Sequence, residues 1–450
     1  MSERTPRPTL WLDVSALVGL AHVTGIPRVI QQLALHWKSQ ASYDVRPCRY
    51  DPTGRTYVSH DSASQEAPPP APVAATPPVP TRPRLMQRVK RRLGQVARRL
   101  PGRVQTALHH YYLGTRALAG EGRAALTQVL QVAPRPPFQP GDALFLPGTD
   151  WGDDRTLAVL PQLRAGYGLR VASIIYDISP LRCPHLLAPY LKDVFAAWLP
   201  CALANSDVIL TISKYSRDDL LTYCATRGLY CPPVEVIRLG DEPVIDQVAQ
   251  RPTVLPQDDR PFAMMVSTLS LHKNQWLLVE VWRRLIRRYG SRVPRLFLVG
   301  GAGWRHEALI EELAGDPGLR DHVYHLHGIP DAQLRWLYRH CQFTLYPSWY
   351  EGWGLPVAES LVNGKPCIAS SATSLPEVGG ALVDYHDPYD ASSLVSLVEQ
   401  ASFDPVWLRE RRDRICRDYR QTSWGSCANQ TIRILEKYLG LVAQTIPNAA

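Results

Sequence analysis

The sequence is most informative about the fold at Tyr346–Glu377, which reads YPSWYEGWGLPVAESLVNGKPCIASSATSLPE. A short apolar run, Phe343–Leu345, leads into it and predicts a buried strand. The Gly- and Trp-rich segment that follows predicts a loop. Pro356 and Gly364 are then the residues expected at the start and just past the end of a short helix. Strand, loop and helix in this order predict one unit of an α/β domain.

Two glutamates flank the expected start of this helix. Glu351 falls in the loop and Glu359 in the first helical turn, and the amides between them belong to Gly352, Trp353, Gly354 and Leu355. A helix N-terminus has unpaired N–H groups and a partial positive charge, so it favours a phosphate oxygen. Carboxylates would repel that anion but would accept hydrogen bonds from hydroxyls beside it, which a nucleotide sugar offers. The alternative is a simple crossover with two solvated glutamates.

Length and composition indicate a soluble protein of more than one domain. At about 150 residues per domain, 450 residues predict two or three domains. The sequence has no apolar run of 18 residues, and its N-terminus lacks a signal-peptide pattern, so neither membrane spanning nor export is expected. The nine cysteines are scattered and form no CxxC pair, which favours reduced cytoplasmic thiols over a zinc site.

The net charge of +9 is concentrated in one segment. Residues 82–103 contain nine basic and no acidic side chains, and they follow a Pro- and Ala-rich stretch at 65–83. We expect an insertion at about 52–140 that contains a basic amphipathic helix at 84–100. Such a helix fits an anionic membrane surface, although it could equally dock on its own protein. The rest of the chain is balanced in charge, so no nucleic-acid partner is expected.

The remaining chain alternates strands with helices in two sets. Residues 1–255 predict a first Rossmann-like domain and residues 260–421 a second, with linker composition between them and a late helix within 422–445. The predicted strands are 10–14, 142–146, 170–175, 208–212 and 234–237 in the first set, and 262–266, 295–299, 323–326 and 343–345 in the second.

Several loops that follow these strands contain candidate site residues. Ligands of open α/β sheets bind at the carboxyl ends of the strands. Gly25, Asp177 and Gly301 lie in such loops, at positions where backbone or a carboxylate could approach a ligand. An ordinary turn glycine and a capping aspartate are the alternatives for the first two.

Six strings, DVS…TGIPRV, YDISP, LTISKYSRDDL, TLSLHKN, YEGWGLPVAES and SLPEV, resemble the retaining glycosyltransferases of family 4 in order and spacing. The resemblance covers nearly all of the chain except about 52–140, and is closest to enzymes of bacterial surface polysaccharides, many of them mannosyltransferases. It implies the GT-B fold, with two Rossmann-like domains facing across a cleft and the last helix returning to the first domain. The donor nucleotide would lie on the C-terminal domain and the acceptor on the N-terminal domain.

The resemblance also implies roles for single residues. Glu351 would bind hydroxyls of the donor sugar, and Glu359 those of the ribose. The amides of 352–355 would bind the sugar and the diphosphate, and Lys273 would pair with the phosphates. Gly25 would approach the diphosphate from the opposite domain. The expected catalytic residues are therefore Glu351, Lys273, Asp177 and Tyr176, and the expected donor-binding residues are Gly25, His272, Gly301, Gly352, Trp353, Gly354, Leu355 and Glu359.

Two positions depart from the family pattern. Tyr176 stands before Asp177 where many members have histidine, and His272 stands before Lys273 where many have arginine. Tyr176 could still bond a sugar hydroxyl, whereas His272 would assist the phosphates only when protonated.

The expected function is a retaining transfer of a hexose, mannose above all, from GDP-mannose to a lipid-linked or growing polysaccharide. The enzyme would be cytoplasmic, peripheral on the inner membrane through 82–103, and free of cofactors. A metal is not expected, because no Asp-x-Asp string occurs. The alternatives are a nucleotide-sugar epimerase of the same fold, or a catalytically idle glycan- or membrane-binding scaffold.

Overall fold

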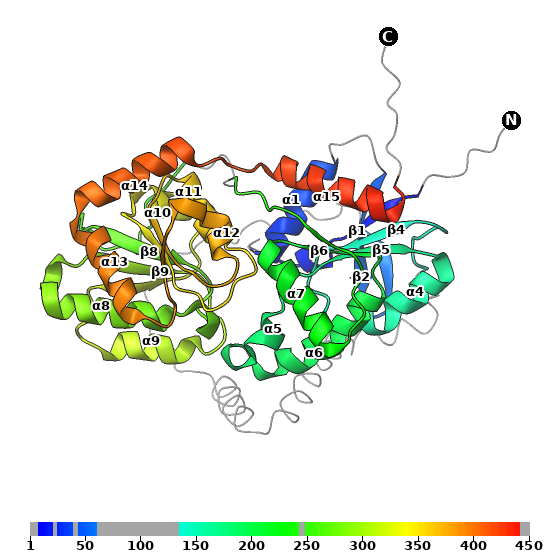
Figure 1. Cartoon of the computed structure of the whole chain (residues 1–450), viewed down its shortest axis with the longest axis horizontal. Coiled ribbons are helices and arrows are strands. Elements are labelled where there is room, and N and C mark those ends of the chain that lie inside the picture. The colour runs from blue at the N-terminus through cyan, green and yellow to red at the C-terminus, as the bar shows by residue number, and fades with distance from the viewer. Residues whose placement is uncertain (1–7, 21–24, 39–43, 61–134, 243–247, 442–450) are drawn as a thin grey trace, which may run out of the picture.

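The computed structural model describes residues 8–20, 25–38, 44–60, 135–242 and 248–441. Two α/β domains lie side by side, with α8–α14 in one and α1, α4–α7 and α15 in the other (Figure 1). Each domain is built on one sheet with helices packed on it, so the predicted α/β class is confirmed. Among the described residues, no helix is both long and apolar enough to cross a bilayer.

The first sheet has the strand order β3-β2-β1-β4-β5-β6-β7. All neighbours are parallel except β3, which pairs antiparallel with β2 at the edge. The central strands β1, β4 and β6 are buried along their whole length, as expected of a parallel sheet covered on both faces. The strands are β1 Leu10–Asp13, β2 Val45–Asp51, β3 Thr56–Ser59, β4 Ala143–Leu146, β5 Arg170–Ile174, β6 Val208–Thr211 and β7 Val234–Val236.

The second sheet has the order β10-β9-β8-β11-β12-β13, and all of its pairs are parallel. This is the strand order of a dinucleotide-binding doubly wound fold. The first three strands extend the sheet in one direction and the last three extend it in the other, so the order reverses between β8 and β11. The strands are β8 Phe262–Val266, β9 Arg295–Val299, β10 Val323–Leu326, β11 Thr344–Tyr346, β12 Cys367–Ser370 and β13 Asp384–His386.

Helices cover both sheets. Those of the first domain are α1 Ile26–Lys38, α4 Leu160–Tyr167, α5 Ser179–Arg182, α6 Pro189–Ala204 and α7 Lys214–Arg227. Those of the second are α8 Gln275–Tyr289, α9 His306–Gly315, α10 Asp331–His340, α11 Leu355–Val362, α12 Leu375–Gly379, α13 Ala391–Phe403 and α14 Pro405–Asp418.

The last helix, α15 Trp424–Leu439, leaves the second domain and lies on the first, across α1 (Figure 1). The Trp37 indole of α1 donates to the Ala428 carbonyl at 3.1 Å. The buried face of α15 includes Ile432, Leu435 and Leu439. Ser423 caps the helix by accepting a hydrogen bond from the Ser426 amide at 3.0 Å.

The predicted insertion at about 52–140 is only partly covered by the described residues. The Pro-rich stretch and the basic helix at 84–100 lie outside the described residues. The boundaries at 52 and 140 are wrong, because β3 belongs to the first sheet and Phe138 is buried against Trp11 with ring centroids 5.7 Å apart. Both flanks of the predicted insertion are therefore part of the domain core.

Candidate active site

A cavity of about 430 Å³ lies between the two domains. This volume is within the range typical of small-molecule sites. Its walls come from loops at the carboxyl ends of β1, β5, β8, β9 and β11, where open sheets bind ligands. Most of the predicted site residues line it: Gly25, Tyr176, Asp177, Lys273, Gly301, Glu351, Gly352, Trp353, Gly354, Leu355 and Glu359. His272 is the predicted residue that the lining does not include.

The N-terminus of α11 points into this cavity. The helix begins at Leu355, with Pro356 in its first turn, and its first hydrogen bond runs from the Val357 amide to the Gly354 carbonyl at 2.9 Å. Gly354 has φ of +123°, and a side chain there would meet Leu375 at 2.6 Å. The loop can therefore turn sharply into the helix only with glycine at this position.

At Gly352 the second domain lies close against the first. A Cβ atom on Gly352 would lie 2.6 Å from the carbonyl oxygen of Tyr176, on the opposite domain. Nearby, the Ser216 hydroxyl donates to the Gly352 carbonyl at 3.2 Å, and the Tyr350 hydroxyl donates to Asp219 at 2.6 Å. These contacts close one wall of the cavity.

Lys273 and Glu351 form an ion pair inside the cavity. The Lys273 ammonium lies 2.8 and 2.7 Å from the two carboxylate oxygens of Glu351. Burial raises the pKa of Glu351, but the attraction of neighbouring groups, Lys273 first among them, and the hydrogen bonds to the carboxylate together leave that pKa below its ordinary value. The loops that present the two residues are joined by Asn274, whose side-chain amide donates to the Pro347 carbonyl at 3.0 Å.

His272 is held beside this pair in its neutral form. Burial, together with the adjacent charge of Lys273, lowers the pKa of His272 to about 4. Its Nδ1 lies 3.1 Å from the Ser270 hydroxyl. The condition under which His272 is expected to assist the phosphates is therefore not met at neutral pH, because the ring carries no charge there.

Glu359 lies in the second turn of α11, not the first, because the helix begins at Leu355. One carboxylate oxygen pairs with Arg28 Nη1 of α1 at 2.7 Å. The other accepts a hydrogen bond from the Tyr338 hydroxyl of α10 at 2.8 Å. Arg28 and Tyr338 were not among the predicted site residues, although Arg28 stands only three positions after Gly25 in the TGIPRV string.

Tyr176 and Asp177 both line the cavity, and each makes a hydrogen bond within the first domain. The Tyr176 hydroxyl is buried and donates to the Pro147 carbonyl at 2.7 Å, so it is directed into the first domain. Asp177 accepts a hydrogen bond from the Ser179 amide, two residues further on, at 2.8 Å. It also faces Gly352, and burial raises its pKa.

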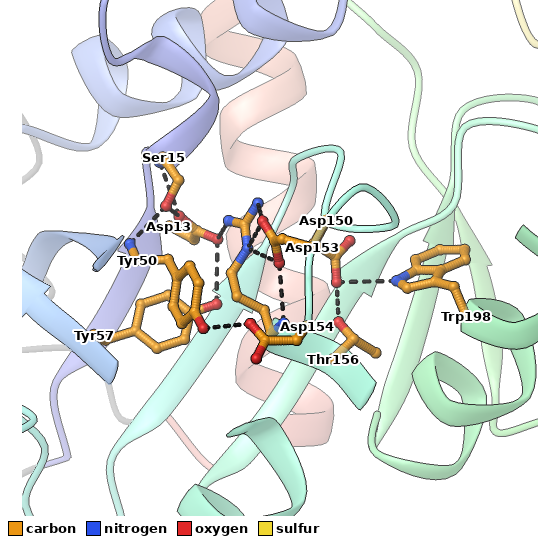
Figure 2. Close-up of polar contacts among 10 residues, drawn as sticks. Asp13, Ser15, Tyr50, Tyr57, Asp150, Asp153, Asp154, Thr156 and Trp198 are labelled. Carbon is orange, nitrogen blue, oxygen red and sulfur yellow. Dashed lines mark hydrogen bonds and ion pairs between the residues drawn. The ribbon is translucent and has the colours of Figure 1, made fainter. Parts of the chain in front are cut away.

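A second polar cluster lies beyond the cavity, at the end of β1 (Figure 2). Arg155 is almost fully buried and pairs with Asp13 at 2.8 Å and with Asp153 at 2.7 Å. Asp13 also accepts hydrogen bonds from Tyr57 at 3.3 Å and from the Ser15 amide at 2.8 Å. The cluster holds Ser15, at the start of the loop that leaves β1. Among the described residues, no group of three His, Cys, Asp or Glu side chains is placed to hold a metal ion.

Residues 246–421 match a family model described as glycosyl transferases group 1. The chain is 30% identical over 271 residues to the O-antigen chain mannosyltransferase B of Escherichia coli, a match that covers 58% of this chain and 69% of that protein. It is 31% identical over 243 residues to the MMP alpha-(1->4)-mannosyltransferase of Mycolicibacterium hassiacum, covering 52% and 55% of the two chains. Against the serotype-specific mannosyltransferase WbdA of Escherichia coli it is 25% identical, and it spans only 29% of that longer protein.

Solved structures show the same architecture. A sucrose-phosphate synthase from Thermosynechococcus elongatus superposes with a TM-score of 0.57 at 17% identity, covering 96% of this chain and 100% of the other. A trehalose-6-phosphate synthase superposes with a TM-score of 0.52 at 15% identity, covering 68% and 76%. The architecture is therefore the GT-B fold, as expected.

Proposed function

This chain belongs to the glycosyltransferases of group 1, and we propose that it is a retaining family 4 enzyme that transfers mannose from GDP-mannose. The acceptor in this proposal is a lipid-linked or growing surface polysaccharide. The printed names of the relatives, mannosyltransferases of O-antigen among them, support both the sugar and the polymer.

The observation that carries the proposal is the position of Lys273, next to the N-terminus of α11 in a cavity bounded by both domains. Glycosyl transfer leaves negative charge on the departing diphosphate. A fixed ammonium and unpaired helix-terminal amides can neutralise that charge as it develops. In this arrangement Lys273 would turn from Glu351 toward the phosphates, and Glu351 would accept hydrogen bonds from the sugar. Because these groups stabilise the leaving group, the proposed mechanism requires no metal.

The contacts of three carboxylates in the cavity support a mechanism in which the acceptor attacks the sugar from the same face that the leaving group departs from. Glu351 and Glu359 are both held in ion pairs, and Asp177 is held by the Ser179 amide. The proposal assigns Glu351 and Glu359 to hydroxyls of the donor and not to a covalent intermediate. Retention without such a nucleophile is the mechanism that the family resemblance implies.

The direct test is turnover of GDP-mannose by the purified full chain with an acceptor glycan. We expect release of GDP that depends on the acceptor, unaffected by EDTA, with the anomeric configuration retained by NMR. Lys273→Ala and Glu351→Ala should each lower the rate, the former by about 100-fold or more. The matched control is Lys437→Ala, since Lys437 forms an ion pair with Glu235 at 2.9 Å outside the cavity. Unchanged turnover in both cavity variants would refute the proposal.

Membrane association is a separate part of the proposal. We place the enzyme in the cytoplasm, on the inner membrane, through the basic segment at 82–103, which the structure does not describe. Sedimentation with vesicles of phosphatidylglycerol should fall when 82–103 is deleted and should also fall with rising salt. Equal retention of the deleted chain would contradict this part alone.

A further inference from the structure

The charges lining the cavity do not match a diphosphate as they stand. Of the described lining residues, two are cationic and four are acidic: Arg28, Lys273, Asp177, Asp331, Glu351 and Glu359. His272, beside Lys273, is neutral at physiological pH. With four carboxylates in the same lining, a second cation beside Lys273 and the helix-terminal amides would improve the match of charges to a diphosphate.

Arg28 is the cationic lining residue that remains. It lies in the first turn of α1, and its side chain is 15% exposed. Nη1 pairs with Glu359 at 2.7 Å, and Nη2 donates to the Glu242 carbonyl at 3.1 Å. Nε is buried and has no hydrogen-bond partner among the described residues. A guanidinium has five N–H donors, so Arg28 keeps donor capacity for a ligand.

Arg28 pairs with Glu359, the carboxylate that we propose binds the ribose. Tyr338 already occupies one oxygen of Glu359, and Arg28 occupies the other. Ribose hydroxyls that bind Glu359 must therefore compete with Arg28 for the second oxygen. In a nucleoside diphosphate the phosphates are attached to that same ribose, so a displaced guanidinium would be within a side chain's reach of them.

We propose that Arg28 is a donor-binding residue that exchanges Glu359 for the diphosphate when the nucleotide sugar enters. A planar guanidinium can hold phosphate oxygens with two parallel hydrogen bonds, which an ammonium cannot. Arg28 thus supplies, from the N-terminal domain, the second cation that the C-terminal domain lacks at His272. The assignment rests on the proposed function, since it takes the ligand to be a nucleoside diphosphate.

The test separates binding of the phosphates from binding of the nucleoside. Calorimetry would measure GDP and guanosine, and in parallel UDP and uridine, with the wild-type chain, Arg28→Gln and Arg28→Lys. We expect Arg28→Gln to weaken diphosphate binding by about 10- to 100-fold. Nucleoside binding should not fall, because Glu359 then has one oxygen free. Arg28→Lys should restore only part of the loss, since it keeps the charge without the planar fork.

The control variant is Arg164→Gln, which breaks an ion pair with Asp207 of 3.0 Å in the same domain but outside the cavity. It should leave all four affinities unchanged. An equal fall for diphosphate and nucleoside in Arg28→Gln would show that Arg28 only holds the domains together, and no change would likewise overturn the assignment. If the wild-type chain bound neither diphosphate, the proposed function would fail first and the assignment with it.

Discussion

The carboxylate of Glu377, in α12 of the second domain, lies 2.6 Å from the backbone nitrogen of Tyr215, in α7 of the first. Its other oxygen accepts a hydrogen bond from the Lys214 amide at 2.9 Å. An acid from one domain thus sits on the positive end of a helix in the other. Within its own domain, α7 is already capped by Ser213, which accepts from the Ser216 amide at 2.9 Å. Glu377 therefore holds the domains together but is not needed to form the helix.

Replacing Glu377 should open the cleft without unfolding α7. We expect Glu377→Gln to weaken the closed arrangement by about 1–2 kcal/mol, roughly a 5- to 30-fold change in its population. Small-angle scattering should show a larger radius of gyration, and the KM for the donor should rise. Glu399→Gln, which breaks an ion pair with Arg288 inside the second domain, should do neither. A loss of helical circular dichroism in Glu377→Gln would contradict this prediction.

Two glycines of the cavity should respond differently to an added methyl group. Gly352→Ala places a Cβ atom 2.6 Å from the backbone oxygen of Tyr176, so the domains must move apart. Because displacements of about 1 Å can cost 100-fold in rate, we expect turnover to fall by at least that factor.

Gly301→Ala is the matched comparison, since a Cβ atom there meets no atom within 4 Å. Its melting temperature should remain that of the wild type. A weaker affinity for GDP in this variant would show that the nucleotide approaches the backbone at Gly301, and an unchanged affinity would remove Gly301 from the donor-binding set.

His272 makes stability depend on pH. Its pKa is lowered from 6.5 to about 4, so between these values the unfolded chain binds the proton more strongly. The stabilisation from the neutral ring is fully present above pH 6.5 and is lost as the pH falls toward 4. The loss between pH 6.5 and 5 should be about 2 kcal/mol. Urea unfolding at both pH values should show this loss in the wild type but not in His272→Gln, and equal losses in both would count against it.

The buried Arg155 cluster should be sensitive to the removal of one partner. Arg155→Met leaves the Asp13 carboxylate, 2% exposed, without its cation, which should destabilise the fold by about 3–5 kcal/mol. Adding Asp13→Asn should recover part of the loss, because the unpaired charge is then gone. Thermal unfolding measures both variants. Arg284→Met, which breaks an exposed pair with Glu280, is the control and should cost about 0.5 kcal/mol or less.

The second domain follows closely from its sequence. The strands β8, β9 and β10 begin and end at the predicted residues. A parallel strand buried on both faces is a continuous apolar run, and an amphipathic helix has a regular period, so both are visible locally. By contrast, the predicted insertion wrongly includes β3. Its four residues are specified by pairing with β2, as in Tyr50 with Tyr57, and not by a local pattern.

The motifs indicate which loops line the cavity, but they do not indicate which side chains contact one another there. Motif positions brought Lys273 and Glu351 to one cavity, but Arg28 and Glu359 are 331 residues apart and meet only through the docking of two domains. Similarly, the sequence places Tyr176 at the cavity, whereas the direction of its hydroxyl depends on the Pro147 carbonyl of a neighbouring loop. These hydrogen-bond partners are determined by tertiary packing, which the spacing of residues in the sequence does not reveal.

The return of α15 to α1 has a consequence for how the chain folds during synthesis. The core around Trp37 needs Ala428 and its neighbours, which the ribosome adds almost four hundred residues later. The second domain, though encoded later, has all of its own strands once residue 386 has emerged. We therefore expect the second-encoded domain to reach its native form before the first. Until α15 is in place, the face of α1 that it covers stays open to chaperones, whereas in most multidomain chains the N-terminal domain folds first.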